Sequence, residues 1–124
     1  DEAFERYLGD RSPAFSPKPY HSAEDVIDLV HRVGGVAVLA HPGTSLPEAI
    51  ILQLVDAGLD GLEVFHPAHQ APQIEYYTQL TAQHNLLQSG GSDSHGGPEG
   101  VRIGDYGIGY EAIDAMRQRS ANYS

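Results

Sequence analysis

The chain has 124 residues, of which 40% are hydrophobic, so it is long enough for one modest core. Its formal net charge of −10 argues against a broad basic surface for nucleic acid, although a phosphorylated substrate could still be bound through metal cations. The absence of cysteine excludes disulfide bonds and thiolate metal ligands, and no apolar run approaches the roughly 20 residues of a membrane-spanning helix.

The first twenty residues are predicted to be a connecting segment. The acidic start does not resemble a secretion signal, so we expect a cytoplasmic protein without membrane contact. A short helix end over Glu2–Leu8 can be closed by Gly9. After it, three prolines between Ser12 and Tyr20 exclude a helix, because proline lacks an amide hydrogen and restricts the residue before it. The globular region is therefore placed at residues 21–124.

From residue 21 onward, predicted helices and strands alternate. Ser22 is a helix cap and Gly34-Gly35 is a helix end, with an apolar stripe between them. Further helices are predicted over residues 47–57, 71–84 and 110–119. Strands are predicted over residues 36–40, 61–65 and 86–89, with a short one around 101–103. Strands that alternate with helices indicate βα units, so the predicted fold class is α/β with a parallel sheet.

Two of these strands run into loops that contain histidine and aspartate. Residues 36–40 lead into His41, and residues 86–89 lead into a Gly/Ser loop with Asp93 and His95. Parallel α/β sheets place their chemistry at the carboxyl ends of strands, and imidazole and carboxylate groups suit Mn²⁺, Fe²⁺ or Zn²⁺. We therefore expect His41, Asp93 and His95 to converge on one metal site. For each residue alone, a polar turn or a capped strand end is the alternative.

Other polar residues lie close to these loops. Glu63 is in phase with Phe65 on its strand, so we expect it to be buried, hydrogen-bonded and supporting the metal site from behind rather than binding metal. His66 follows this strand as a candidate substrate contact, with a loop-filling role as the alternative. Arg102 is a candidate phosphate contact, with a solvent-facing arginine as the alternative. Three histidines near helix ends are predicted to be ordinary surface residues: His21, His31 and His84.

Three ordered motifs carry a family resemblance: Val38–Gly43 (VLAHPG), Asp60–His69 (DGLEVFHPAH) and Gly90–Gly96 (GGSDSHG). Together they resemble the later half of the PHP (polymerase and histidinol phosphatase) family of metal-dependent phosphoesterases, over about residues 4–110. The greatest likeness is to the branch that dephosphorylates nucleoside 3',5'-bisphosphates or trims short RNA from the 5' end. The resemblance implies that the three candidate ligands bind metal, with Asp93 and His95 also catalytic. It also implies that His69 contacts substrate, so we expect this residue to be partly open to a pocket.

The earlier half of that family has a His-x-His motif, a further histidine and a glutamate, and none of these is found in this sequence. The chain is therefore expected to be the C-terminal part of a distorted (β/α)7 PHP barrel, supplying its last three or four strands. The resemblance implies two or three divalent ions in the complete site, namely Mn²⁺, Fe²⁺ or Zn²⁺, with Mg²⁺ also compatible. Alone, the chain is expected to be inactive and to self-associate through its open strand edges.

The predicted function of the parent protein is hydrolysis of phosphate esters, with a phosphorylated small molecule or a short nucleic acid as substrate. Two alternatives remain open. A metal-dependent amidohydrolase uses similar barrels and ligands, and a non-catalytic α/β interaction module needs no metal. The presence of all three ligands expected in this half favours a catalytic protein over the interaction module.

Overall fold

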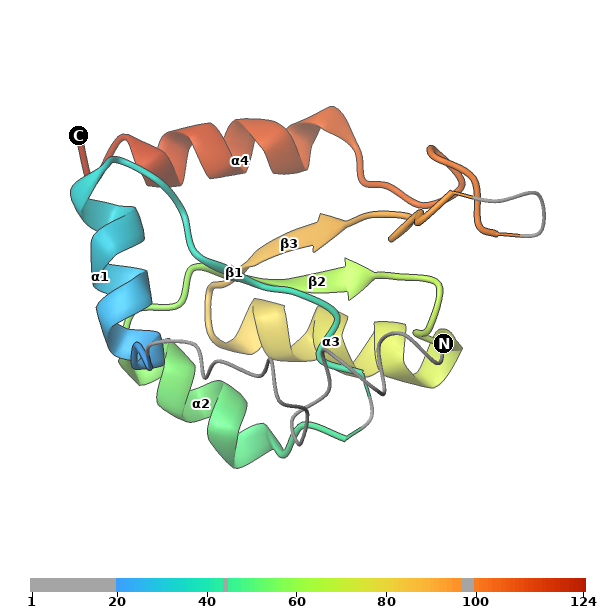
Figure 1. Ribbon diagram of the computed structural model, residues 1–124, viewed down its shortest axis with the longest axis horizontal. Coiled ribbons are helices and arrows are strands. Elements are labelled where there is room, and N and C mark those ends of the chain that lie inside the picture. Colours follow the sequence, from blue (N-terminus) through green and yellow to red (C-terminus); the bar gives the residue numbers. More distant parts are fainter. Residues whose placement is uncertain (1–19, 44, 97–99) are drawn as a thin grey trace, which may run out of the picture.

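The computed structural model describes residues 20–43, 45–96 and 100–124, so the connecting segment up to residue 19, with the helix end at Glu2–Leu8, lies outside the described residues. The described part alternates helices with strands. In chain order these are α1 (Ala23–Arg32), β1 (Val38–Leu39), α2 (Glu48–Asp56), β2 (Gly61–Phe65), α3 (Ala71–Gln83), β3 (Leu87–Gly90) and α4 (Tyr110–Ser120). The predicted α/β class is confirmed (Figure 1).

The three strands form one parallel sheet in the order β1-β2-β3. Because all three run in the same direction, their carboxyl ends share one edge, where the arrowheads of β2 and β3 point in Figure 1. The pairing of β2 with β3 shifts register between Glu63 and Phe65, and Phe65 pairs with Gly90. A Cβ atom on Gly90 would lie 2.7 Å from the Cβ of Phe65, closer than real Cβ contacts come, so this pairing requires glycine.

The strand predicted over residues 86–89 is shifted by one residue, to Leu87–Gly90, and two other predicted strands differ more from the structure. β1 is shorter than residues 36–40 because the amide of Ala37 donates to the Asp60 carboxylate at 2.8 Å rather than to a neighbouring strand. The predicted strand around 101–103 is wrong. There the amide of Arg102 donates to the Asp105 carboxylate, and the amide of Asp105 donates to the carbonyl of Arg102, which closes a turn.

The helices begin and end close to their predicted positions, for local reasons. The Ser22 hydroxyl accepts the Asp25 amide at 3.1 Å and caps α1, and Gly34 follows the helix with a φ of 77°. Before α3, the amide of Gln70 donates to the side chain of Gln73 at 3.0 Å in a capping box. These contacts fix where each helix enters and leaves the sheet layer.

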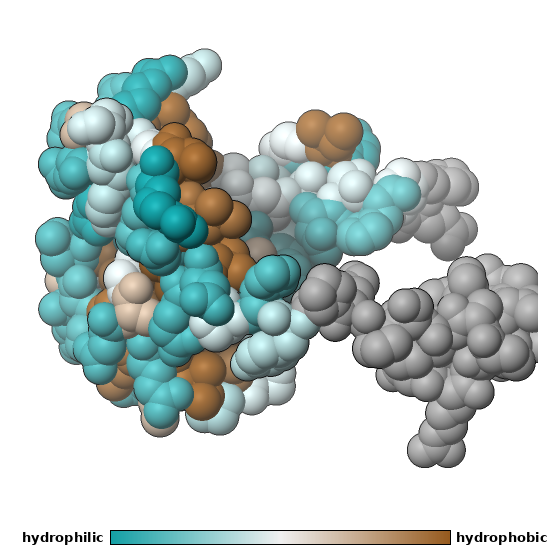
Figure 2. Space-filling model, turned by 60° about the vertical axis from the view of Figure 1, so that its left-hand side comes forward, coloured by the Kyte–Doolittle hydropathy of each residue, from teal (hydrophilic) through white to brown (hydrophobic). Residues whose placement is uncertain are grey.

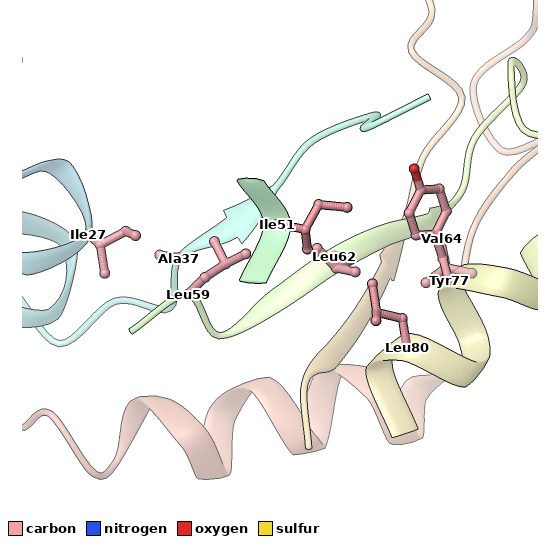
Figure 3. Packing of buried hydrophobic residues seen from close by; sticks show 8 residues of the cluster. All are labelled: Ile27, Ala37, Ile51, Leu59, Leu62, Val64, Tyr77 and Leu80. Carbon is pink, nitrogen blue, oxygen red and sulfur yellow. The ribbon is translucent and has the colours of Figure 1, made fainter. Parts of the chain in front are cut away.

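The hydrophobic core lies between β2 and the helices α2 and α3. Leu62 and Val64 of β2 are fully buried and pack in one cluster with Ile51, Tyr77 and Leu80 (Figure 3). Their neighbours on the opposite face of β2 are only half-buried, as the alternation along the strand predicts. Truncation of Leu62 to alanine should therefore cost about 2–5 kcal/mol of folding free energy.

Asp60, directly before β2, joins four groups at the amino end of the sheet and is 1% exposed. Its Oδ2 accepts the Ala37 amide and His31 Nε2, both at 2.8 Å, and its Oδ1 accepts the Tyr123 hydroxyl at 2.7 Å and Arg119 Nη1 at 3.3 Å. Burial alone would raise the pKa of this carboxyl, but hydrogen bonds from Tyr123 and Ala37 and the neighbouring His31 outweigh it and lower the pKa. The cluster ties α1, β1, β2 and α4 together.

His31 is thus not the ordinary surface residue that its position near a helix end predicts. Its ring also stacks on that of Tyr123, with the centroids 3.9 Å apart and the planes 10° apart. In Figure 1, α1 and the C-terminal end of α4 lie together at the left, away from the strand arrowheads.

Large hydrophobic side chains of α1 and its C-cap stay exposed, among them Val26, Leu29 and Val33. An open groove of about 680 Å³, lined mostly by apolar residues of α1 and of residues 36–40, adjoins them. Figure 2 shows hydrophobic residues as a brown band between hydrophilic surfaces. Within the described ranges, no helix is long and apolar enough to cross a membrane.

Candidate functional site

The loops after the three strands bring four polar side chains into one row of contacts at the carboxyl edge of the sheet. The rings of His41 and His66 lie with their centroids 5.4 Å apart. His66 Nε2 is 3.5 Å from Oδ2 of Asp93, and His95 Nδ1 is 3.9 Å from Oδ1 of Asp93. His66 therefore lies between the candidate ligand of the first loop and those of the third.

The backbone is unusual at two of the candidate ligands. His41 has a φ of 28° and Asp93 a φ of 47°, in the left-handed region that residues with a Cβ atom rarely adopt. Such conformations typically cost about 1–3 kcal/mol and concentrate at functional sites. Both loops therefore hold their ligand candidates in conformations that the rest of the fold must enforce.

Glu63 enforces the conformation of the first loop. Its Oε2 accepts the backbone amide of His41 at 2.6 Å, and a Cβ atom on Gly91 would lie 3.5 Å from its Oε1. The expected hydrogen bond is confirmed, whereas the expected burial is wrong: Glu63 is half-buried, because it projects from the face of β2 opposite the helices. Its predicted role behind the metal site stays a prediction.

His69 holds the first loop at a second point, two residues further along the chain. Its Nδ1 donates to the carbonyl of Val64 at 2.9 Å, and its Nε2 accepts the amide of Gly43 at 3.1 Å. The Tyr77 hydroxyl donates to the carbonyl of the same glycine. The expectation that His69 is partly open to a pocket is wrong, since it is 4% exposed and both its nitrogens are bonded to backbone. The structure gives it a positioning contact, and its contact with substrate stays a prediction.

The two remaining histidines of the site differ in which ring nitrogen is engaged. His66 is 6% exposed, and its Nδ1 accepts the amide of Ala68 at 3.1 Å. His95 has an 82% exposed side chain, and its Nδ1 donates to the backbone carbonyl of Asp93 at 2.6 Å. The Nε2 of His95 thus keeps its lone pair and faces solvent, the arrangement usual for a metal-binding imidazole.

Arg102 lies in the exposed turn after the third loop. Its Nη2 is 3.4 Å from the Asp105 carboxylate. This exposure agrees with the alternative of a solvent-facing arginine, and its predicted phosphate contact stays a prediction.

The donor types fit a divalent first-row metal ion, since histidine nitrogen and carboxylate oxygen are the ligands that such ions take. Within the described residues, however, no group of three or more histidine, aspartate or glutamate side chains is arranged to hold one. The row of contacts therefore offers part of a ligand set. Sequence reasoning named all four of its members. It did not predict the backbone hydrogen bonds of the His66 and His69 rings, because these depend on the folded loops and cannot be seen in a sequence motif.

No family model matches the chain. The chain is 40% identical over 77 residues to a phosphoribosyl 1,2-cyclic phosphate 1,2-diphosphodiesterase from Eggerthella lenta, covering 62% of this chain and 29% of that protein. It is 34% identical over 104 residues to a 3',5'-nucleoside bisphosphate phosphatase from Chromobacterium violaceum, covering 80% of this chain and 36% of that protein. The chain thus spans about a third of the length of these curated relatives.

Among solved structures, the chain is similar to a protein from Bifidobacterium adolescentis that is assigned as a metal-dependent phosphoesterase. The TM-score is 0.77 at 31% sequence identity, and the likeness covers 95% of this chain and 43% of that protein. The βα units described above are therefore those of a larger phosphoesterase fold.

Proposed function

We propose that the chain is part of a metal-dependent phosphoesterase of the PHP family and supplies part of the active site of a phosphate-ester hydrolase. Its curated relatives are named for phosphate-ester hydrolysis, and the similar solved structure is named as a metal-dependent phosphoesterase. The observation that carries this proposal is the row of contacts from His41 through His66 to Asp93 and His95 at the carboxyl edge of a parallel sheet. This edge is where α/β folds of this kind hold their chemistry.

In the proposed site, His41, Asp93 and His95 hold divalent metal ions: Mn²⁺, Fe²⁺ or Zn²⁺, with Mg²⁺ also compatible. Two or three ions would need further ligands from outside the described residues. When bound, such ions offset the negative charge of the phosphate and lower the pKa of a bound water toward 7.

The chain's own residues prepare this site before any ion binds. The contact of His95 Nδ1 with the Asp93 carbonyl aims the free lone pair of Nε2 outward. Glu63 and His69 hold the turn of His41 at two points, through its amide and through Gly43. A ligand held in this way loses little freedom when it binds a metal ion.

The proposed substrate is a phosphorylated small molecule, a nucleotide or a short nucleic acid. The two curated relatives are named for a phosphoribosyl cyclic phosphate and for a nucleoside 3',5'-bisphosphate, and both compounds are small and doubly phosphorylated or cyclic. A formal net charge of −10 fits a compact substrate bound through cations better than a long nucleic acid on a basic surface.

The test uses the complete protein that carries this chain, loaded with Mn²⁺ or Zn²⁺. Release of phosphate from a nucleoside 3',5'-bisphosphate and opening of a cyclic phosphate should both be assayed, beside a panel of amide substrates. Asp93→Asn and His95→Gln should each lower kcat/KM at least about 100-fold, because removing a ligand should cost at least as much as removing the contact behind one. His84→Gln, at the exposed C-terminal end of α3, is the matched control.

Full activity of both ligand variants would refute the assigned site. Turnover of amides without turnover of phosphate esters would instead favour the amidohydrolase alternative. Chelation of the metal should abolish activity in the parent protein and in the control variant alike, because both depend on the metal.

A further inference from the structure

His66 is held in one tautomer by the turn that it begins. Its Nδ1 accepts the backbone amide of Ala68 at 3.1 Å. A ring nitrogen that accepts a hydrogen bond carries no proton, so the proton of the neutral ring lies on Nε2. The local backbone therefore makes Nε2 of His66 a donor.

This donor is buried and unpaired. Among the described residues, His66 Nε2 is the one buried side-chain nitrogen or oxygen without a hydrogen-bond partner. An unsatisfied buried donor typically costs about 1–3 kcal/mol, which is rarely tolerated without a function. The acceptor that it faces is Oδ2 of Asp93, at 3.5 Å, a few tenths of an ångström beyond the usual N–H···O range.

The opposite polarity is found at His95. There Nδ1 donates to a backbone carbonyl, so Nε2 has the free lone pair that a metal ligand needs. His69 has both nitrogens bonded to backbone and nothing left to offer. His95, His69 and His66 therefore present, in turn, a lone pair, no free group and a proton.

We propose that His66 is a positioning residue of the metal site and not one of its ligands. Its Nε2–H donates to Oδ2 of Asp93 and leaves Oδ1 to face the metal ion. A donor on one carboxylate oxygen fixes the plane of the carboxylate and the oxygen that binds. Contacts behind a ligand typically change metal affinity or activity about 10–100-fold. The inference rests on the proposed function, since it requires that Asp93 binds metal.

The first test compares two variants of the complete protein by competitive Zn²⁺ titration. Gln can place an amide N–H where Nε2–H lies, so His66→Gln should keep Zn²⁺ affinity within a few-fold of the parent. His66→Leu has similar bulk and no donor, so it should weaken Zn²⁺ binding about 10–100-fold. His84→Gln again serves as the exposed control and should leave the affinity unchanged.

The second test reads the tautomers directly. Long-range ¹H–¹⁵N spectra of histidine-labelled protein report which ring nitrogen carries the proton, and they need no variant that might unfold. His66 should keep its proton on Nε2 with and without Zn²⁺, whereas Nε2 of His95 should change to the signature of a coordinated nitrogen.

Coordination of Zn²⁺ by His66 Nε2 would overturn the inference. A His66→Leu protein that binds Zn²⁺ as the parent does would also overturn it. If that variant raised KM and changed nothing else, His66 would be a substrate contact. Asp93→Asn and His95→Gln separate the two levels: if neither weakens Zn²⁺ binding, the proposed function fails. If both do and His66→Leu does not, only the role of His66 fails.

Discussion

Both ends of the sheet place an aspartate beside histidine, but only one end is closed. At the amino end, Asp60 is 1% exposed and accepts four hydrogen bonds, one of them from His31. At the carboxyl end, the side chain of Asp93 is 46% exposed, with His66 and His95 at 3.5 and 3.9 Å. At the amino end, where the polar groups are hydrogen-bonded, the aspartate–histidine pair therefore stabilises the fold. At the carboxyl end, where groups are left unpaired, the same pair remains accessible to a ligand.

The difference in stability between the two ends can be tested most directly by substitution of Asp60. Asp60→Ala should cost about 3–5 kcal/mol of unfolding free energy in the complete protein, because it removes the acceptor of four hydrogen bonds, one of them from the buried Ala37 amide. Asp93→Ala should cost less, at most about 1.5 kcal/mol, because the side chain of Asp93 is 46% exposed and its contact with His66 is long, at 3.5 Å. Denaturant titration measures both. Equal losses at the two aspartates would show that the two ends do not differ as described.

A second substitution tests how much His69 contributes to the stability of the carboxyl end. His69→Leu should cost about 1–3 kcal/mol, because it leaves the Gly43 amide and the Val64 carbonyl unpaired in a buried place. His84→Leu is the exposed control and should be nearly neutral. A neutral His69→Leu whose turnover is nonetheless reduced would return this histidine to the predicted substrate contact.

The pH dependence of stability sharpens the comparison further. The folded-state pKa of Asp60 is lowered below its ordinary value of 3.8, so its contribution is present above that value and is lost as the pH falls through the folded-state pKa. Stability should therefore decline in acid below about pH 4. Asp60→Asn should flatten this decline, as measured by denaturant titration from pH 7 to 3. An unchanged acid slope would exclude Asp60 as its source.

The smallest effect is expected at Arg102. Because its side chain is exposed and its contact with Asp105 lies in a surface turn, Arg102→Ala should change stability by less than about 0.5 kcal/mol. Turnover of phosphate esters should also stay near that of the parent. A tenfold rise in KM with stability unchanged would instead establish the predicted phosphate contact.

The order of elements could be read from the sequence because it depends on local signals. Gly61–Phe65 is the predicted strand to the residue, since Leu62 and Val64 alternate with less buried neighbours and glycine precedes them. The cluster at Asp60 could not be foreseen, because its partners lie 23 to 63 residues away in the chain and meet only in the folded state.

The same distinction between local sequence signals and contacts formed on folding applies to the site. The position of His41, Asp93 and His95 at the carboxyl edge of the sheet could be predicted from their place after strands, and their binding of metal stays a prediction. The donor at His66 could not, because it depends on one backbone contact with Ala68 that selects the tautomer. Nor could the burial of His69, which depends on how closely the turn at Gly43 approaches β2.

Gly90 bears on how substitution data for this region would be interpreted. It lies at the end of β3, directly before the loop that carries the candidate ligands, and its missing side chain makes room for Phe65. In a deep mutational scan, position 90 should therefore be as intolerant as a true ligand position, although it has no group that can bind metal or move a proton. Protein abundance would separate the two cases: variants at Gly90 should be lost from the soluble pool, whereas variants at Asp93 should accumulate normally and lack activity.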